Sequence, residues 1–374
     1  YTFRREFKRS GITTISDMPT GNPGVLNVSL MKEKLESAKK NAYVDFALYG
    51  GAGKNNLDEL EAMVKAGAIA FKTYMIGQGG YSCGDDPYIL ELLKKASEIN
   101  AITGWHAENG NLIDYLVQEL KNKDRKDPMA HVESRPNYTE YEAISKLIIF
   151  NKIAKAHLHI IHLSTKEGLE MIKAAKETGM KITTETCPHY LLLNYEYMDK
   201  VGPYGKFIPP MRSEEDRLAM WKGIHDGTIN YICSDHAPHT KKSKDAGKTD
   251  IWKAGNGNPG LETMVPLMLD QVNKGNLSLQ QLVKLLSENP AKVFKMYPKK
   301  GSFKIGSDAD LTVVDLNKKW RITADKMYSK SADTTIYEGW EVKGKPTITI
   351  VRGKKVAEDG VVIGERGYGE YIKR

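Results

Sequence analysis

Short apolar runs alternate with helix-like segments along about 300 residues of this chain. The apolar runs lie near residues 12, 44, 69, 102, 158, 182 and 229, and amphipathic stretches such as TEYEAISKLIIFNKIAKA lie between them. Runs of this length are typical of strands buried on both faces, and strands that alternate with helices form a parallel sheet. The pattern therefore predicts an α/β fold with seven strands of a (β/α)8 barrel.

Four of these runs end in a residue that can take part in catalysis. AIAFK ends at Lys72, AITGWH at His106, LHIIH at His162 and INYICSD at Asp235. The chemistry of a (β/α)8 barrel collects at the C-terminal ends of its strands, so these residues predict a metal site there. Burial lowers the pKa of a lysine, and a neutral amine can react with carbon dioxide to give a carbamate that bridges two metal ions.

Each of these residues also has a structural alternative. A histidine at a strand end can be a hydrogen-bonded core residue, Lys72 can pair with an acid, and Asp235 can cap the segment that follows it. The combination of the four favours the metal site over these alternatives. We interpret His157 and His159 as structural, because they lie toward the start of their strand and at the opposite parity to His162.

The pattern changes near residue 300. GSFKIGSDADLTVVDL, PTITIVRGKKVAEDG and VVIGERGYG are short β-runs broken by Gly and Asp. We therefore expect a barrel over residues 1–300, and the C-terminal part of a small β domain with a tail over 301–374. Seven strands are one fewer than a closed barrel needs, so we expect the first barrel strand to be absent from this chain.

The composition limits the partners of the protein. The formal net charge is +8, but the lysines alternate with acids, as in KNKDRKD, which is typical of solvated helix faces and does not favour nucleic acid. No apolar run approaches the roughly 18 residues of a membrane span, and the first residues lack the apolar core of a signal peptide. We expect a cytoplasmic protein without a membrane or nucleic-acid partner. Three cysteines, Cys83, Cys187 and Cys233, are too few and too scattered for a disulfide framework or a cysteine-rich zinc site.

Eight segments occur in an order typical of one family: GITTISDMP, FKTYM, HAENG, IIHLS, ETCPHYL, IPPMR, SDHAPH and NPGLET. Together they resemble the cyclic amidohydrolases of the amidohydrolase superfamily, which include dihydroorotase, allantoinase and hydantoinase/dihydropyrimidinase. The resemblance implies a TIM-like barrel with a small β-sandwich domain, two divalent metal ions (commonly zinc), a carbamate on Lys72, and a homodimer or homotetramer. It also implies that His106 and His162 hold one ion, while Asp235 holds the other and moves the proton of the attacking water.

One part of the family pattern has no counterpart in this chain. Members carry an HxH pair at the end of the first barrel strand, which is the strand expected to be absent here. The alternative is a non-catalytic relative that keeps the barrel as a scaffold. The presence of Lys72, His106, His162 and Asp235 argues against a scaffold, which has no use for a lysine at a metal-bridging position.

The substrate-binding segments resemble more than one member of the family. His239 in SDHAPH resembles the dihydroorotase histidine that binds the substrate carboxylate, but Thr20 and Ile208 stand where that pattern has Asn. Asn256 matches the hydantoinase pattern, Gly77 stands where hydantoinases carry Tyr, and FKTYM and DIWKAGNG resemble allantoinase. We expect hydrolysis of a C–N bond in a small cyclic amide, with dihydroorotase first and allantoinase or hydantoinase as alternatives. His239, Asn256, Ile208 and Thr20 are the expected substrate contacts.

Overall fold

Parallel strands form the centre of the computed structural model, which describes residues 10–77, 81–82 and 85–373; Cys83 lies outside them. One sheet has the order β3-β4-β5-β6-β7-β8, and a second parallel pair is β1-β2. The strands are β1 (Thr14–Asp17), β2 (Asp45–Leu48), β3 (Gly50–Gly51), β4 (Phe71–Tyr74), β5 (Ile102–His106), β6 (His157–Ile160), β7 (Ile182–Thr186) and β8 (Tyr231–Ile232). Only Tyr49 separates β2 from β3. Its N–H donates to Asp17 O, and Gly50 N–H donates to Ala70 O, each at 2.9 Å. β2 and β3 are therefore one strand, and the seven predicted strands are confirmed.

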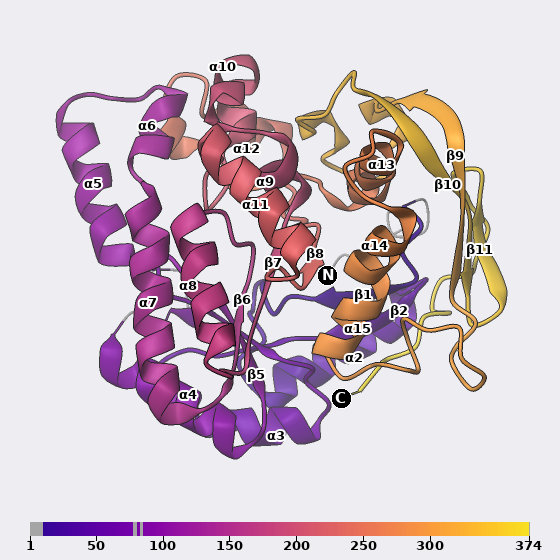
Figure 1. The fold of residues 1–374 in the computed structure, drawn as a ribbon, viewed down its shortest axis with the longest axis horizontal. Helices are drawn as coiled ribbons and strands as arrows, with labels where there is room; N and C mark the ends of the chain where they lie inside the picture. Colours follow the sequence, from indigo (N-terminus) through magenta and orange to yellow (C-terminus); the bar gives the residue numbers. More distant parts are fainter. Residues whose placement is uncertain (1–9, 78–80, 83–84, 374) are drawn as a thin grey trace.

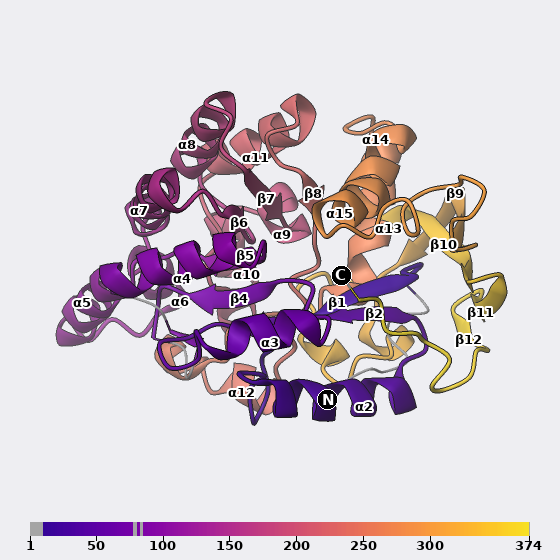
Figure 2. The same ribbon diagram turned by 90° about the horizontal axis from the view of Figure 1, so that it is seen from below.

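Helices surround this sheet (Figures 1 and 2). They are α2 (Val28–Asn41), α3 (Glu59–Lys65), α4 (Asp86–Glu98), α5 (Gly110–Asn122), α6 (Pro128–Glu133), α7 (Asn137–Ala154), α8 (Lys166–Glu177), α9 (Pro188–Leu192), α10 (Met198–Val201), α11 (Glu214–Asp226), α12 (Lys241–Asp245), α13 (Leu261–Asn273), α14 (Leu279–Val283) and α15 (Asn289–Val293). Neighbouring outer helices pack on one another, α4 on α7, α7 on α8, and α8 on α11. Across the described ranges, none of the helices has the length and apolar character needed to span a membrane.

Local sequence signals explain where these elements begin and end. Helix α11 begins at a capping box, in which Ser213 and Asp216 bond each other's backbone N–H, and it ends at Gly227 with a φ of +78°. All five residues of β5 and all four of β6 are buried. Burial on both faces is what the continuous apolar runs predict for strands covered by helices.

A separate antiparallel sheet contains the C-terminal strands, at the right of Figure 1. Its order is β12-β11-β10-β9, from β9 (Leu311–Arg321), β10 (Glu341–Val351), β11 (Lys354–Glu358) and β12 (Val361–Val362). The sheet packs against α13, where the Asn273 side-chain amide donates to Leu316 O at 3.0 Å and to Lys343 O at 2.9 Å. The small β domain is present, and its boundary near residue 300 stays a prediction.

The last residues of the chain return to the barrel. Phe46 N–H donates to Glu370 O at 2.9 Å, and Ile372 N–H donates to Phe46 O at 2.8 Å. Phe46 also pairs with Ile15 of β1. The tail therefore adds backbone hydrogen bonds to the first half of β2, ahead of the point where this strand pairs with β4.

A buried ionic cluster joins the barrel, the small sheet and the tail. Asp45, at the first position of β2, is 1% exposed. It accepts from Lys300 Nζ at 2.5 Å, from the Arg352 guanidinium, and from Glu370 N–H at 2.8 Å. Lys300 also contacts Asp310 at 2.5 Å and Asp308 at 2.9 Å. We call these five side chains, Asp45, Lys300, Asp308, Asp310 and Arg352, the Asp45 cluster.

Replacing Asp45 by Asn tests the cluster. The change removes one charge from a buried network and leaves Lys300 and Arg352 with fewer acceptors, so we expect the free energy of unfolding to fall by about 3–5 kcal/mol. Urea denaturation followed by circular dichroism measures it. Glu341→Gln, which breaks the exposed Arg321–Glu341 pair, is the control and should cost less than about 1 kcal/mol. Equal effects of the two variants would contradict the assigned role of the cluster.

Candidate functional site

The four strand-end residues converge at one end of the sheet. Lys72 lies on β4, His106 is the last residue of β5, His162 follows β6 by two residues, and Asp235 follows β8 by three. His106 Nδ1 lies 3.0 Å from His162 Nε2, although 56 positions separate the residues. Lys72 Nζ lies 4.1 Å from the centre of the Tyr74 ring, and that ring lies 5.3 Å from the His106 ring. The parallel strands therefore bring together the residues that the sequence singled out.

Both imidazoles are held neutral. Burial lowers the pKa of His106 to about 4, although Glu108 opposes this shift, and burial lowers the pKa of His162 well below its ordinary value. Metal ions bind the neutral ring. Two nitrogen ligands of a tetrahedral zinc ion lie roughly 3.3 Å apart. The facing nitrogens of His106 and His162 are close to that separation, so this pair fits a metal ion.

Glu108 is a site residue that the sequence prediction missed. Its Oε2 lies 2.7 Å from His106 Nε2 and accepts from Arg135 at 2.5 Å, and the side chain is fully buried. Burial raises the pKa of Glu108, but Arg135 and His106 outweigh this effect and lower it to about 2. An ionised Glu108 assigns the proton of His106 to Nε2, which leaves the Nδ1 lone pair facing His162. The one sequence signal that Glu108 orients His106 is its position two residues after His106, within HAENG.

Lys72 is buried without an ion-pair partner among the described residues. Its side chain is 3% exposed, and no carboxylate of the described ranges lies within ion-pair distance. Burial lowers the pKa of Lys72 to about 7, although the charges of Asp235 and Glu185 oppose this shift. A large fraction of the amine is therefore neutral near pH 7. The structural alternative, a lysine paired with an acid, is not observed in the part of the chain that the structure describes.

Asp235 and His162 have an uncommon backbone conformation. Their φ angles are +40° and +41°, in the left-handed region that non-glycine residues rarely adopt. Such residues are enriched at functional sites, where the surrounding structure holds them in place. Burial raises the pKa of the Asp235 carboxyl to about 6, although Lys72 opposes this shift. Asp235 is thus mostly ionised at neutral pH, yet more basic than a solvated carboxylate.

Two sequence motifs lie side by side beyond β8. Ala237 N–H donates to Asn258 O at 3.1 Å, and the backbone of Asn256 hydrogen-bonds the ring of His239. Gly257, with a φ of +128°, passes so close to Ala237 that a Cβ there would lie 2.4 Å from Ala237 O. The glycine therefore permits this close approach of the two loops. We call the paired segments 234–239 and 255–260 the loop wall.

The other two expected substrate contacts lie outside this group. Thr20 is exposed in the loop after β1, and Ile208 is half-buried ahead of a cis peptide bond to Pro209. Within the described residues, no hydrogen bond or ring contact joins Thr20 or Ile208 to the four strand-end residues. Their substrate contacts stay predictions.

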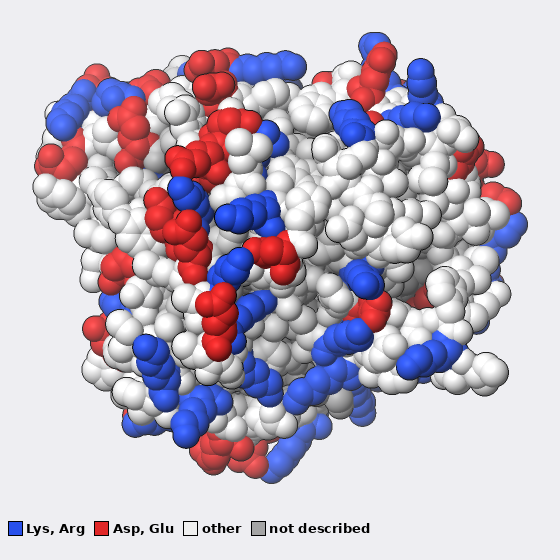
Figure 3. Space-filling model, viewed as in Figure 1, with Lys and Arg blue, Asp and Glu red and all other residues white. Residues whose placement is uncertain are grey.

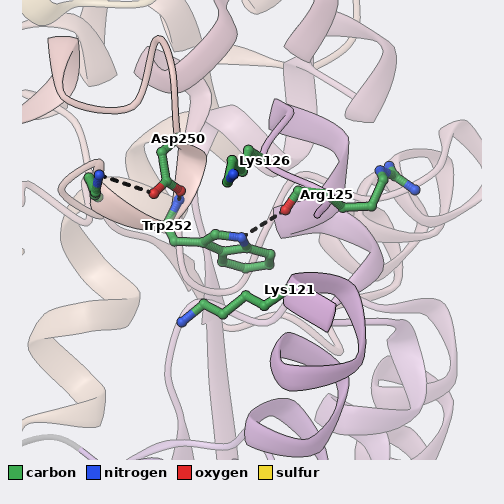
Figure 4. Close-up of a pocket in the computed structure, with 6 residues that line it drawn as sticks. Lys121, Arg125, Lys126, Asp250 and Trp252 are labelled. Atoms are coloured by element: carbon green, nitrogen blue, oxygen red, sulfur yellow. Dashed lines mark hydrogen bonds and ion pairs between the residues drawn. The ribbon is translucent and has the colours of Figure 1, made fainter. Parts of the chain in front are cut away.

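The DIWKAGNG stretch lies at an open pocket on the barrel surface, shown in Figure 4. The pocket is lined by Lys121, Arg125, Lys126, Asp250, Trp252 and Lys253. The Trp252 indole N–H donates to Arg125 O at 2.9 Å, so this ring has a structural contact. Arg125 pairs with Asp127 and Glu133, and Lys126 pairs with Asp124. Nearby acids therefore offset most of the positive charge of this pocket.

Two further histidines, His157 and His159, have hydrogen-bond partners within the sheet. The His159 ring contacts Thr183 Oγ1 through Nδ1 and the Tyr231 hydroxyl through Nε2, each at 2.9 Å. His157 Nε2 contacts the same Thr183 hydroxyl at 3.0 Å. Figure 3 shows acidic and basic side chains mixed over one face, with several basic ones along its lower edge.

Comparison with known proteins identifies the family. The model of the amidohydrolase family matches residues 2–356. An L-hydantoinase of Paenarthrobacter aurescens is 38% identical over 367 residues, covering 97% of this chain and 80% of that protein. A dihydroorotase of Pyrococcus furiosus is 37% identical over 368 residues, covering 97% of this chain and 77% of that protein.

A solved structure gives the same result for the fold. The L-hydantoinase (dihydropyrimidinase) from Arthrobacter aurescens superposes with a TM-score of 0.95 at 37% identity, covering 99% of this chain and 84% of that one. The fold is therefore that of a TIM-type barrel with a small β-sandwich domain, as predicted. The resemblance drawn from the eight sequence segments is confirmed: this chain belongs to the amidohydrolase family.

Proposed function

We propose that this protein hydrolyses a C–N bond in a cyclic amide of the hydantoin type. The observation that carries the chemistry is the convergence of two neutral imidazoles, a buried lysine without an ion pair among the described residues, and Asp235. The substrate class rests on the relatives, among which an L-hydantoinase is 38% identical. These comparisons favour the hydantoinase alternative over dihydroorotase, which the sequence analysis placed first.

The site residues suit two divalent metal ions. His106 Nδ1 and His162 Nε2 would hold one ion, Asp235 would hold the other, and a carbamate on Lys72 would bridge them. Zinc fits this set, since it binds imidazole nitrogen and carboxylate oxygen. When bound, two such ions lower the pKa of a shared water and polarise the amide carbonyl. Association into homodimers or homotetramers stays an expectation from the family.

Asp235 is the residue we assign to proton transfer. A carboxylate with a pKa of about 6 is ionised at neutral pH and basic enough to accept a proton from the attacking water. The proton then passes to the amide nitrogen as the C–N bond breaks, so the ring opens to a carboxylate and a neutral leaving group. The strained backbone at Asp235 fixes the direction of this side chain.

The loop wall suits the polar edge of a hydantoin ring. The Asn256 side-chain oxygen is buried and lacks a hydrogen-bond partner in the described structure. A ring N–H of the substrate would supply the missing donor. His239, bonded to the same Asn256 backbone, would lie beside the substituent of the ring. We retain Thr20 and Ile208 as candidate substrate contacts.

A substrate panel tests the proposed function directly. Hydantoin, dihydrouracil, dihydroorotate and allantoin are supplied separately to the zinc-loaded full-length protein, and ring opening is followed by loss of ultraviolet absorbance or by chromatography. We expect the highest kcat/KM for hydantoin. A higher kcat/KM for dihydroorotate would restore the first expectation from the sequence. Absence of turnover with all four compounds, with metal bound, would contradict the proposed substrate class.

The Asp235→Asn variant tests the proton-transfer role. An amide cannot take the proton, so we expect kcat to fall by roughly 10²- to 10⁴-fold on the best substrate. The circular dichroism spectrum should not change. Asp199→Asn, at an exposed position of α10, is the matched control and should keep full activity. Near-normal kcat in Asp235→Asn would remove Asp235 from the mechanism.

The Glu108→Gln variant tests whether Glu108 positions His106. Gln is neutral and can present either an amide N–H or an oxygen to His106, so the Nε2–H tautomer is no longer enforced. Loss of a carboxylate behind a metal-binding histidine typically weakens metal affinity by roughly 10- to 100-fold. Metal retained after competition with a chelator measures this affinity independently of turnover. The exposed Glu91→Gln is the control, and equal retention in both variants would contradict the role of Glu108.

A further inference from the structure

Two cysteines that are distant in sequence meet beside Asp235. Cys187 directly follows β7 and Cys233 directly follows β8, and the last residues of these strands, Thr186 and Ile232, pair in register. The two Sγ atoms lie 3.4 Å apart, at hydrogen-bond distance, and both cysteines are free. The parallel register therefore places two thiols at the same end of the sheet as the four strand-end residues.

A histidine and a carboxylate lie close to the first of these thiols. One ligand atom each from Cys187, His189 and Asp235 lie within 4.8 Å of one another. His189 is 4% exposed, its ring stacks on Phe207 at 4.6 Å, and its Nε2 has no hydrogen-bond partner in the described structure. Burial lowers the pKa of His189 to about 3, so the ring is neutral. A buried imidazole nitrogen without a partner is unusual, since buried polar atoms are normally hydrogen-bonded, and the ring that carries it also lies near a thiol.

We propose that Cys187, His189 and Asp235 form a second metal site, which shares Asp235 with the catalytic ions proposed above and favours a soft divalent cation such as Cd²⁺. Sulfur, imidazole nitrogen and carboxylate oxygen are the donors that such ions accept, and the thiol is the donor that selects for softness. On binding, the Cys187 S–H bond is replaced by a sulfur–metal bond and one proton is released to solvent. Lys72, His106 and His162 take no part in this set.

Ligand distances allow this site with small side-chain movements. A tetrahedral ion has ligand atoms at roughly 2.0–2.3 Å, so its ligand atoms lie roughly 3.3–3.8 Å from one another. The separations of up to 4.8 Å in the structure exceed this range by about an ångström. Binding therefore requires the side chains of Cys187, His189 and Asp235 to move closer together by about that amount. Cys233 Sγ lies outside the three-ligand group, although it contacts Cys187.

The other group of potential ligands in the described residues is already occupied by a cation of the protein. Asp45, Asp308 and Asp310 also lie within 4.8 Å of one another. Lys300 Nζ lies 2.5–2.9 Å from a carboxylate oxygen of each of them. That group therefore needs no metal ion. In contrast, the described structure brings no lysine or arginine within ion-pair distance of Asp235, and His189 keeps its unpartnered nitrogen.

Binding at this second site would have a consequence for the proposed reaction. A cation held by Cys187, His189 and Asp235 would engage the carboxylate that we assign to proton transfer. We therefore expect soft cations to inhibit turnover by competing for Asp235. This consequence rests on the proposed function, whereas the metal binding itself rests only on the geometry.

Cadmium binding tests the site through a sulfur-dependent absorbance band, which the ligands of the proposed catalytic ions cannot produce. The full-length protein carrying Cys83→Ser is reduced, its free thiols are counted, and it is titrated with Cd²⁺ while the ultraviolet sulfur-to-cadmium charge-transfer band is recorded. We expect one thiolate-bound Cd²⁺ per chain. The band is independent of hydrolysis, and Lys72, His106 and His162 contain no sulfur. A negative result here would therefore leave the proposed hydrolase function untouched.

Three further variants, each in the Cys83→Ser protein, decide which side chains bind. Cys187→Ser should abolish the band, and His189→Gln should weaken the dissociation constant for Cd²⁺ at least tenfold. Cys233→Ser makes the same thiol-to-hydroxyl change on the neighbouring strand and should change the dissociation constant less than threefold. A band of normal strength in Cys187→Ser, or unchanged affinity in His189→Gln, would overturn the proposal. Equal loss in Cys187→Ser and Cys233→Ser would also overturn the three-ligand assignment.

Discussion

Parallel pairing of β3 through β8 is the constraint on which the candidate site depends. In a parallel sheet all the strands end at the same edge, so residues distant in sequence meet there if each lies at the end of its own strand. His106 and His162 are 56 positions apart and their ring nitrogens lie 3.0 Å apart. The same pairing brings Cys187 and Cys233 into contact. A shift of one residue in the register would separate each of these pairs and turn the side chains to the other face of the sheet.

The charged groups that stabilise the fold and the groups proposed for catalysis lie at opposite ends of the barrel strands. The Asp45 cluster lies at the first residue of β2, where charges are compensated: Lys300 contacts three carboxylates and Arg352 contacts Asp45 as well. At the opposite end of the strands, Lys72 has no carboxylate partner among the described residues, and His162 and His189 each have a buried nitrogen without a partner. Uncompensated polar groups cost stability, so their concentration at the C-terminal ends is typical of a site kept for binding.

The sequence predicts the strand-end residues because the relevant signal is local. An apolar run followed by Lys72, His106 or His162 specifies both a strand and the end at which the side chain lies. Glu108 and Arg135 could not be paired in this way, because 27 positions and two helices, α5 and α6, separate them and their contact depends on side-chain geometry. The same holds for Cys187 and Cys233, which looked scattered in the sequence although the strand register makes them neighbours. The sequence motifs could not decide between hydantoinase and dihydroorotase, because His239 and Asn256 resemble different members of the family. In the structure these two residues lie side by side.

The loop wall shows why substrate preference is hard to derive from residue identities. Its geometry is fixed by glycines and by backbone hydrogen bonds, such as the bond from Ala237 N–H to Asn258 O. A Cβ at position 257 would lie 2.4 Å from Ala237 O, and one at position 260 would lie 2.3 Å from Ser234 O. These glycines therefore decide how closely the two segments of the loop wall approach each other, without contributing a side chain. Backbone N–H and C=O groups placed in this way can bind the polar edge of a ring, and the contacts that distinguish one cyclic amide from another then depend on loop conformation more than on side-chain type.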